Sequence, residues 1–267
     1  MSKYINLYVE ADCQMSNDIE TPFLYSVTLL RDKIKNFDSF PFTLPIINNF
    51  NSITLHPKIT FLVGENGSGK STLLEAIAIA CGFNAEGGTK NFTFSTKKSH
   101  TDLWKNIRLS RSFRQQKDGF FLRAESFYNL ATEIVKLDEE PALAPPIIAS
   151  YGNVSLHEQS HGEAFLAVML HRFQGQGLYI LDEPESALSP TRQMAMIKRI
   201  HELINQGSQF IIATHSPILM AYPNAKILSL DEQKITTIQY NKTDHFTITK
   251  YFLNNHEKMI NYLLEEN

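Results

Sequence analysis

The sequence contains little cysteine and no long apolar segment. Its two cysteines, Cys13 and Cys81, lie far apart and match no metal-binding spacing, which suits a reducing compartment. No stretch approaches the ~18 apolar residues of a membrane-spanning helix, and residues 1–6 do not begin a secretory leader. We therefore expect a soluble, cytoplasmic protein that does not insert directly into a membrane.

Strong net charge and internal repeats are also missing. The net charge is −3, so the overall composition does not favour nucleic-acid binding. One basic segment, residues 103–114 with Lys117 beside it, is compatible either with a solvated face or strand edge or with a contact to a partner or nucleic acid. The 43% hydrophobic content over 267 residues is sufficient for one globular domain of medium to large size.

A complete phosphate-binding loop is present at residues 64–71, with the sequence G-E-N-G-S-G-K-S. It follows an apolar stretch and precedes a helical pattern, which is the context that the motif G-x-x-x-x-G-K-[ST] requires. Glycines let backbone N–H groups turn toward phosphates, and the start of the helix adds a positive dipole. We expect Lys70 to neutralise the β- and γ-phosphates and Ser71 to ligate Mg²⁺. The predicted nucleotide-binding residues are Asn66, Gly67, Ser68, Gly69, Lys70, Ser71 and Thr72.

Polar residues with suitable chemistry follow two other apolar strands. Asp182 and Glu183 come directly after a run of four apolar residues, and His215 comes shortly after another such run. Short apolar strands that alternate with helices predict an α/β fold with a mostly parallel sheet, and ligands bind at the carboxyl ends of its strands. We expect Asp182 to hold Mg²⁺ beside Ser71, and Glu183 to act as general base toward the attacking water.

These residues resemble the motifs of the ABC-type ATPase family. Asp182-Glu183-Pro184 is similar to its Walker B element with the catalytic glutamate, and residues 186–189 are similar to its D-loop. Thr214-His215-Ser216 resembles its switch histidine, which implies that His215 contacts the γ-phosphate. The resemblance implies a P-loop NTPase of ABC type with ATP and Mg²⁺ as cofactors. It also implies an N-terminal antiparallel β portion and a small helical lobe.

The signature of that family, L-S-G-G-Q, has a partial counterpart in residues 159–163, Q-S-H-G-E. Ser160 and Gly162 match, whereas Glu163 replaces the family's glutamine. The resemblance implies that Ser160, Gly162 and Glu163 act in trans on ATP held by a second subunit. It therefore implies an ATP-dependent head-to-tail dimer, either a homodimer or a heterodimer, of which we expect the homodimer.

Two further family elements have several candidates. The family places a glutamine just after a strand, and here Glu125 follows the apolar segment 120–124, with Gln115 and Gln116 as alternatives. The aromatic residue that stacks on adenine has three candidates upstream of the phosphate-binding loop, each of which also suits the core: Phe37, Phe40 and Phe42.

The chain as a whole resembles a group of small stand-alone bacterial predicted ATPases that carry an AAA-family label. We expect a single domain over residues 1–267. Its predicted parts are a β portion (1–58), an inserted lobe with the signature (about 85–175), the Walker B and switch region (176–240) and a helical tail (241–267).

Three functions are compatible with these motifs. The first is an ATP-gated switch or clamp that acts on a protein effector or a nucleic acid. The second is the nucleotide-binding subunit of a membrane transporter, for which the altered signature and Glu125 are less suitable. The third is the regulatory ATPase half of a defence or toxin system.

Overall fold

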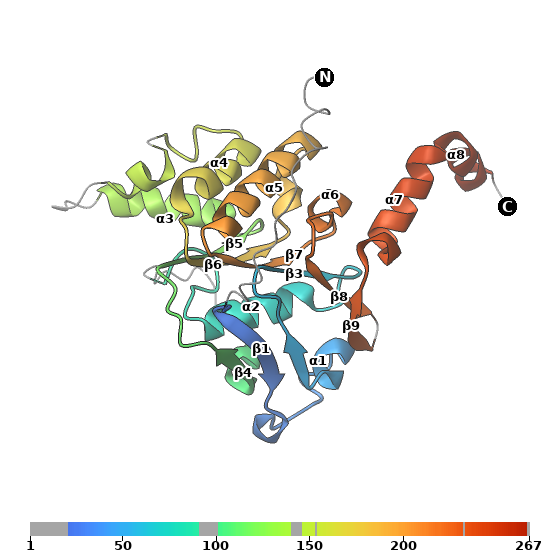
Figure 1. Ribbon diagram of the computed structural model, residues 1–267, viewed down its shortest axis with the longest axis horizontal. Helices are drawn as coiled ribbons and strands as arrows, with labels where there is room; N and C mark the ends of the chain where they lie inside the picture. The colour runs from blue at the N-terminus through green and yellow to red at the C-terminus, as the bar shows by residue number, and fades with distance from the viewer. Residues whose placement is uncertain (1–20, 91–100, 140–145, 153, 232, 266–267) are drawn as a thin grey trace.

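A six-stranded sheet forms the centre of the protein in the computed structural model, which describes residues 21–90, 101–139, 146–152, 154–231 and 233–265 (Figure 1). The strand order is β5-β6-β7-β3-β8-β9, and every neighbouring pair is parallel except β8 and β9. The bounds are β3 (Ile59–Val63), β5 (Asp118–Arg123), β6 (Gly177–Asp182), β7 (Gln209–Ala213), β8 (Lys226–Asp231) and β9 (Lys234–Ile238). The predicted α/β fold with a mostly parallel sheet is confirmed.

The central strands β6, β7 and β3 are buried along their whole length. Their apolar side chains alternate between two hydrophobic cores, one on each face of the sheet. In β3, for example, Leu62 belongs to one core, whereas Phe61 and Val63 belong to the other. This double burial fixes the carboxyl ends of three strands side by side.

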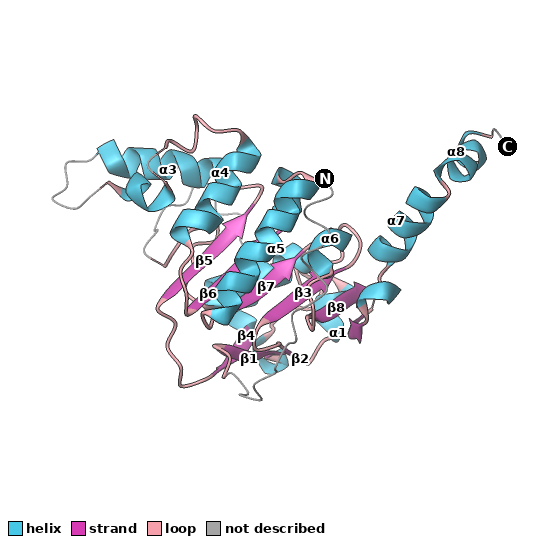
Figure 2. Cartoon of the chain, turned by 45° about the horizontal axis from the view of Figure 1, so that its top comes forward, coloured by secondary structure: helices cyan, strands magenta, loops and turns pink. Residues whose placement is uncertain are grey.

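One face of the sheet is covered by α2 and a small antiparallel sheet with the order β2-β1-β4, while α3 to α6 cover the other face (Figure 1, Figure 2). The elements on the first face are β1 (Leu24–Leu29), α1 (Pro45–Asn49), β2 (Ser52–Thr54), α2 (Lys70–Ala80) and β4 (Ile107–Arg111). Those on the second face are α3 (Phe127–Glu139), α4 (His161–Ala167), α5 (Pro190–Asn205) and α6 (Pro217–Met220).

The glycines and polar residues of segment 82–119 predict irregular structure, and strand β4 within it shows that this prediction is wrong for residues 107–111. Ile107 and Leu109 alternate with polar residues and pair with Leu29 and Val27 of β1. This alternation is typical of a strand with one buried face. Because it includes only two apolar residues, it is a weak signal in the sequence.

The basic segment that includes β4 is partly used for internal contacts. Arg111 donates to the carbonyl of Ala80, and Arg114 donates to the carbonyl of Gly207. The guanidinium of Arg114 also lies 4.5 Å from the ring centroid of Phe23. These two arginines therefore stabilise the fold, which favours the structural interpretation of the segment.

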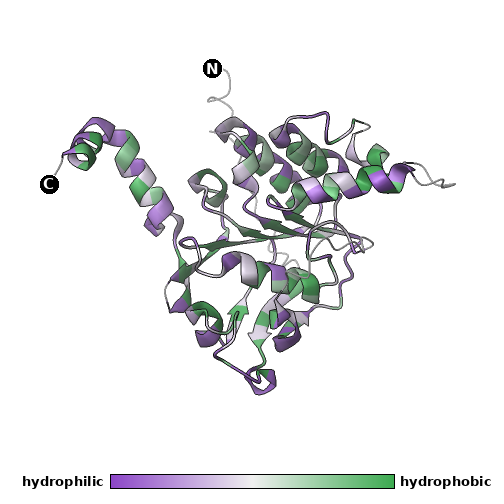
Figure 3. Ribbon diagram, turned by 180° about the vertical axis from the view of Figure 1, so that it is seen from behind, coloured by the Kyte–Doolittle hydropathy of each residue, from purple (hydrophilic) through white to green (hydrophobic). Residues whose placement is uncertain are grey.

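Residues 244–264 form an arm that extends from the body of the protein (Figure 2). It consists of α7 (Asp244–Asn254) and α8 (His256–Leu264), and neither helix has a buried residue. Apolar and polar residues alternate along both helices (Figure 3). We call this segment the C-terminal arm. In the described part of the chain, no helix combines the length and apolar character needed to cross a membrane.

Candidate active site

The phosphate-binding loop joins β3 to α2, and its shape depends on glycine. Gly64 has φ +149°, and a Cβ there would lie 2.5 Å from the carbonyl oxygen of Leu230. Gly69 has φ +94° at the position before α2. The loop thus has the tight curl that directs backbone N–H groups inward. Above it is a cavity of about 350 Å³ lined by Phe40, Leu44, Asn66, Gly67, Gly69, Lys70, Ser71, Thr72 and Glu183.

The amine of Lys70 lies inside this loop. Its Nζ donates to the carbonyl oxygens of Gly64 at 2.8 Å and Glu65 at 2.9 Å. Burial lowers the pKa of Lys70, and the carboxylates of Glu183 and Asp182 oppose that shift. The amine is therefore held where phosphate oxygens would take the place of carbonyl oxygens as its acceptors.

Asp182 ends β6 directly beside Ser71. The hydroxyl of Ser71 donates to Asp182 Oδ1 at 3.0 Å, and the Asp182 side chain is only 6% exposed. Burial raises the pKa of Asp182 to about 6, although the guanidinium of Arg123 and the hydroxyl of Ser71 lower it. A hydroxyl and a carboxylate are oxygen ligands that suit Mg²⁺, and a buried carboxylate gains from a divalent cation. Ser71 and Asp182 therefore fit the metal, which would neutralise phosphate charge.

Glu183 and His215 face each other across the ends of β6 and β7. Oε1 of Glu183 is 3.5 Å from Nε2 of His215. The backbone of Glu183 has φ +49°, a left-handed conformation that a non-glycine residue adopts at some cost, and it donates to the carbonyl of Ala213. The strand ends thus hold both side chains at the edge of the sheet that also carries Lys70.

Glu125 is also near this group of residues. A cavity of about 210 Å³ is lined by Ser71, Ala124, Glu125, Asp182, Glu183 and Ser186. The carboxylate of Glu125 is 85% exposed and pairs with Arg123 at 3.2 Å. Its rivals, Gln115 and Gln116, precede β5 and line neither this cavity nor the one above the loop.

Arg123 was not selected from the sequence, yet it contacts three carboxylates. It lies 2.7 Å from Glu75, 3.2 Å from Glu125 and 3.5 Å from Asp182. Arg123 ends β5 and pairs in register with Asp182, which ends the neighbouring strand β6. An arginine at the end of a strand beside the Asp182 strand was the signal for this role. Arg123 compensates the charge of Asp182 while that carboxylate is buried.

The signature-like residues begin α4, on a different part of the surface. Ser160 and Glu163 form a capping box, in which Glu163 accepts from the Ser160 backbone and hydroxyl. Arg192 of α5 donates to the other oxygen of Glu163 at 2.8 Å. Glu163, which replaces the family's glutamine, therefore stabilises the start of α4, and Arg192 compensates its charge.

Gly162 packs against the turn that follows Glu183. A Cβ at Gly162 would lie 2.5 Å from the carbonyl oxygen of Ala187 and 2.7 Å from Arg192. Glycine is thus required here by the close approach of two backbones. The signature-like segment and the D-loop-like residues 186–189 consequently form one packed unit.

Replacing Asp182 with asparagine is expected to stabilise the nucleotide-free protein and to abolish Mg²⁺-dependent turnover. The pKa of about 6 instead of 3.8 means that the ionised carboxylate costs the fold about 2–3 kcal/mol at neutral pH. Between about pH 4 and pH 6, the folded protein binds more protons at Asp182 than the unfolded chain does, so this cost is present above pH 6 and disappears as the pH falls. The gain in Tm should therefore be largest near pH 7.5 and shrink toward pH 5.

Asp118→Asn is the matched control, because it changes the same group at the start of the neighbouring strand β5, at the opposite edge of the sheet from Asp182. Asp118 accepts hydrogen bonds from Arg172, the Gln174 backbone and the Tyr179 hydroxyl. Its substitution should lower Tm and leave the Mg²⁺ dependence unchanged. A lower Tm for Asp182→Asn at pH 7.5 would contradict the prediction for Asp182.

Two family models match the chain. One, described as "AAA domain", matches residues 33–163, and the other, described as "AAA domain, putative AbiEii toxin, Type IV TA system", matches residues 149–221. An energy-coupling factor transporter ATP-binding protein of Fusobacterium nucleatum subsp. nucleatum is 30% identical over 165 residues, which cover 58% of this chain and 62% of that protein. An ABC transporter ATP-binding protein of Caldanaerobacter subterraneus subsp. tengcongensis is 27% identical over 224 residues, covering 77% and 90%. These comparisons support an ABC-type P-loop ATPase.

The chain spans 62% of the length of the first of these relatives. Among solved structures, the SMC head domain from Thermotoga maritima is similar with a TM-score of 0.44 at 17% identity, over 81% of this chain and 99% of that chain. The assignment of the fold rests on the strand order and the loop geometry of this chain.

Proposed function

We propose that this chain binds Mg-ATP and hydrolyses it in a head-to-tail dimer, as an ATP-gated switch or clamp on a protein or nucleic-acid partner. The observation that supports hydrolysis best is the convergence of three groups at one edge of the sheet. Glu183 and His215 lie 3.5 Å apart there, and Glu183 lines the cavity above the loop together with Lys70. A carboxylate base, an imidazole donor and a phosphate-binding amine are groups that can promote phosphoryl transfer to water.

In this proposal each residue has a distinct task. Lys70 and the loop N–H groups bind the phosphates, and Glu183 accepts a proton from the attacking water. His215 donates a hydrogen bond to the terminal phosphate, because its Nε2 is the ring nitrogen that faces the site. Ser71 and Asp182 would hold Mg²⁺, which supplies charge neutralisation.

Adenine would stack on Phe40. Of the three candidate aromatic residues, Phe42 is buried and the ring of Phe37 packs edge-on against it at 6.4 Å. Phe40 is 63% exposed and lines the cavity above the loop. An exposed aromatic ring beside the phosphate site is free to stack on a base.

The second subunit would supply the other half of the ATP site. Ser160 is exposed at the start of α4, and Gly162 is buried against Ala187 of the segment 186–189. The family resemblance assigns both segments to the dimer interface. ATP from the partner would have to replace Glu163 as the acceptor of the Ser160 hydroxyl bond. We expect this exchange to make dimerisation dependent on ATP.

A transporter subunit is the second candidate, because the two relatives described above are named as transporter ATP-binding proteins. The regulatory half of a toxin system is the third, and the description of the second family model favours it. A pull-down with an ATP-trapped variant separates the three. A retained membrane protein would indicate the transporter subunit, a retained toxin the regulatory half of a toxin system, and a nucleic acid or another protein effector the switch or clamp.

Phosphate release and light scattering test the proposal on the unmodified chain. We expect release that requires Mg²⁺ and stops with a chelator, together with an ATP-dependent increase to twice the monomer mass of 30.4 kDa. No release at any protein concentration would overturn the enzyme assignment. Normal release by a chain that stays at 30.4 kDa would overturn the dimer only.

A further inference from the structure

His245, at the base of the C-terminal arm, contacts the switch histidine directly. Nε2 of His245 is 2.8 Å from Nδ1 of His215, and the two ring centroids are 5.0 Å apart. The other nitrogen of His215, Nε2, is 3.5 Å from Glu183 Oε1. His215 thus lies between a second imidazole and the proposed catalytic carboxylate.

These contacts determine which nitrogen of His215 carries the proton. A neutral imidazole donates from one nitrogen and accepts at the other. Because Nε2 of His215 faces a carboxylate oxygen, a lone pair there would be repelled, and the proton belongs on Nε2. Nδ1 of His215 must then accept a hydrogen bond, and Nε2 of His245 must donate it.

The surroundings of the two rings favour this neutral arrangement. Burial is the largest cause that lowers the pKa of both His215 and His245, and the charge of Lys70 lowers both further. Within the described part of the chain, Nε2 of His215 approaches Glu183 at 3.5 Å and makes no shorter hydrogen bond. Its N–H can therefore turn to a stronger incoming acceptor.

We propose that His245 is a positioning residue that holds His215 in the Nε2–H tautomer, so that His215 can donate to the terminal phosphate of ATP. The proposal rests on the proposed function. Without the His245 donor, the Nδ1–H tautomer becomes accessible, and a lone pair at Nε2 would then face the phosphate oxygen. Incorrect tautomers of this kind reduce turnover without preventing binding.

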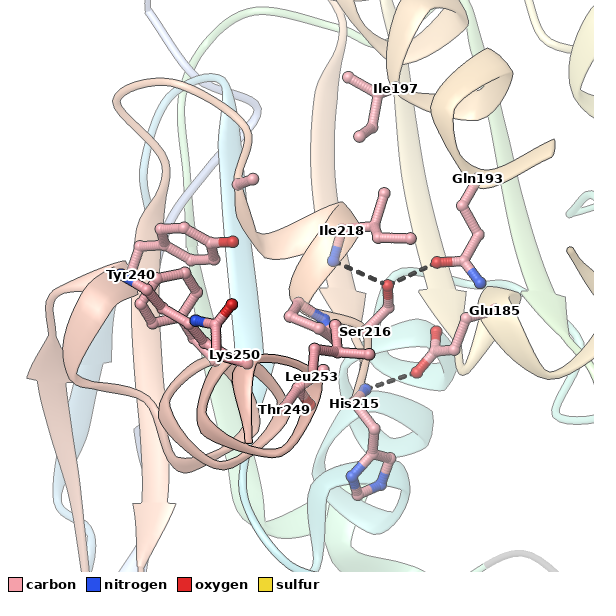
Figure 4. Close-up of a pocket in the computed structure, with 14 residues that line it drawn as sticks. Glu185, Gln193, Ile197, His215, Ser216, Ile218, Tyr240, Thr249, Lys250 and Leu253 are labelled. Atoms are coloured by element: carbon pink, nitrogen blue, oxygen red, sulfur yellow. Dashed lines mark hydrogen bonds between the residues drawn. The ribbon is translucent and has the colours of Figure 1, made fainter. Parts of the chain in front are cut away.

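The anchoring of the arm explains how His245 reaches this position. Thr243 is buried, and its hydroxyl caps α7 by accepting from the Phe246 backbone at 3.3 Å and donating to the Tyr240 carbonyl at 2.8 Å. Figure 4 shows Thr249, Lys250 and Leu253 of α7 in the same pocket as His215, whose backbone N–H donates to Glu185. The same turn therefore attaches the arm and presents His245 to the site.

A pair of substitutions that differ by one methylene tests the role of His245. Glutamine places its amide Nε2 at the position of the imidazole Nε2 and can donate, whereas asparagine is too short to reach. We expect kcat to fall by about 10–100-fold in His245→Asn with KM within about threefold, and to stay within about threefold of the unmodified protein in His245→Gln. His256→Asn, an exposed histidine on α8 of the same arm, should leave both parameters unchanged.

The tautomer itself is measurable by ¹⁵N chemical shifts of the histidine rings in the nucleotide-free protein, with His215→Gln to assign the signal. We expect the proton on Nε2 in the unmodified protein and an increased Nδ1–H population in His245→Asn. A proton on Nδ1 of His215, or an unchanged kcat in His245→Asn, would overturn the inference. Failure of the unmodified chain to hydrolyse ATP would instead overturn the proposed function, and the tautomer measurement does not depend on turnover.

Discussion

Replacing Glu183 with glutamine is expected to reduce ATP turnover by about 10²-fold or more while ATP binding persists. Glutamine has nearly the same size but cannot accept a proton from water. The backbone geometry should survive, because Glu183 donates to Ala213 at 3.0 Å and its carbonyl accepts from the backbone of Ser186 at 3.1 Å. The variant should therefore lose the chemical step and retain the site.

A second result is expected from the same variant. Since ATP is consumed slowly, Glu183→Gln should accumulate as an ATP-bound dimer, detected by light scattering as twice the monomer mass of 30.4 kDa. Phosphate release in single-turnover experiments measures the chemical step separately from nucleotide binding.

Glu185→Gln is the appropriate comparison, because it removes a carboxylate two residues away. Burial raises the pKa of Glu185, and Oε1 of its side chain accepts from the backbone of His215, a contact that glutamine retains. We expect at most a few-fold loss of turnover. Equal losses in both variants would mean that Glu183 has no special role as base.

Replacing Lys70 with alanine is expected to weaken ATP binding by about 10²-fold or more and to leave no measurable turnover. Lys70 is only 4% exposed, and its amine lies inside the loop, where it donates to two carbonyl oxygens. Charge-assisted hydrogen bonds to phosphate are worth about 1.5–3 kcal/mol each. Calorimetric titration with ATP measures the loss of affinity directly.

Lys198→Ala provides the control for Lys70→Ala, since Lys198 is exposed on α5. Its removal should change neither affinity nor turnover. Thermal unfolding should show that Lys70→Ala remains folded, because α2 is held by its apolar residues in the core. Unchanged ATP affinity in a folded Lys70→Ala protein would exclude residues 64–71 as the phosphate site.

The sequence was sufficient to predict the elements whose local pattern is strong. The stretch before Gly64 contains only residues suited to a buried strand, and β3 is buried throughout. The same holds for the strands that end at Asp182 and Ala213. Because parallel strands place their carboxyl ends at one edge, the approximate grouping of Ser71, Asp182 and His215 also followed from the order of elements.

The remaining features depend on contacts between distant segments. His245 lies 30 residues from His215, in a tail whose pattern predicts only a helix. Arg123 contacts Glu75 across 48 residues, and no spacing rule predicts that pair. Ser160 could be expected to cap a helix, whereas the pairing of Glu163 with Arg192 depends on how α4 and α5 pack.

The contact between Gly162 and Ala187 has a consequence for a dimer. Because two backbones meet there without an intervening side chain, the segment that would touch the partner's ATP cannot shift without moving the turn that begins at Glu183. In a head-to-tail arrangement, that turn serves the subunit's own ATP. Binding of ATP at the two sites would then be coupled. Turnover should depend on ATP concentration more steeply than it does for independent sites.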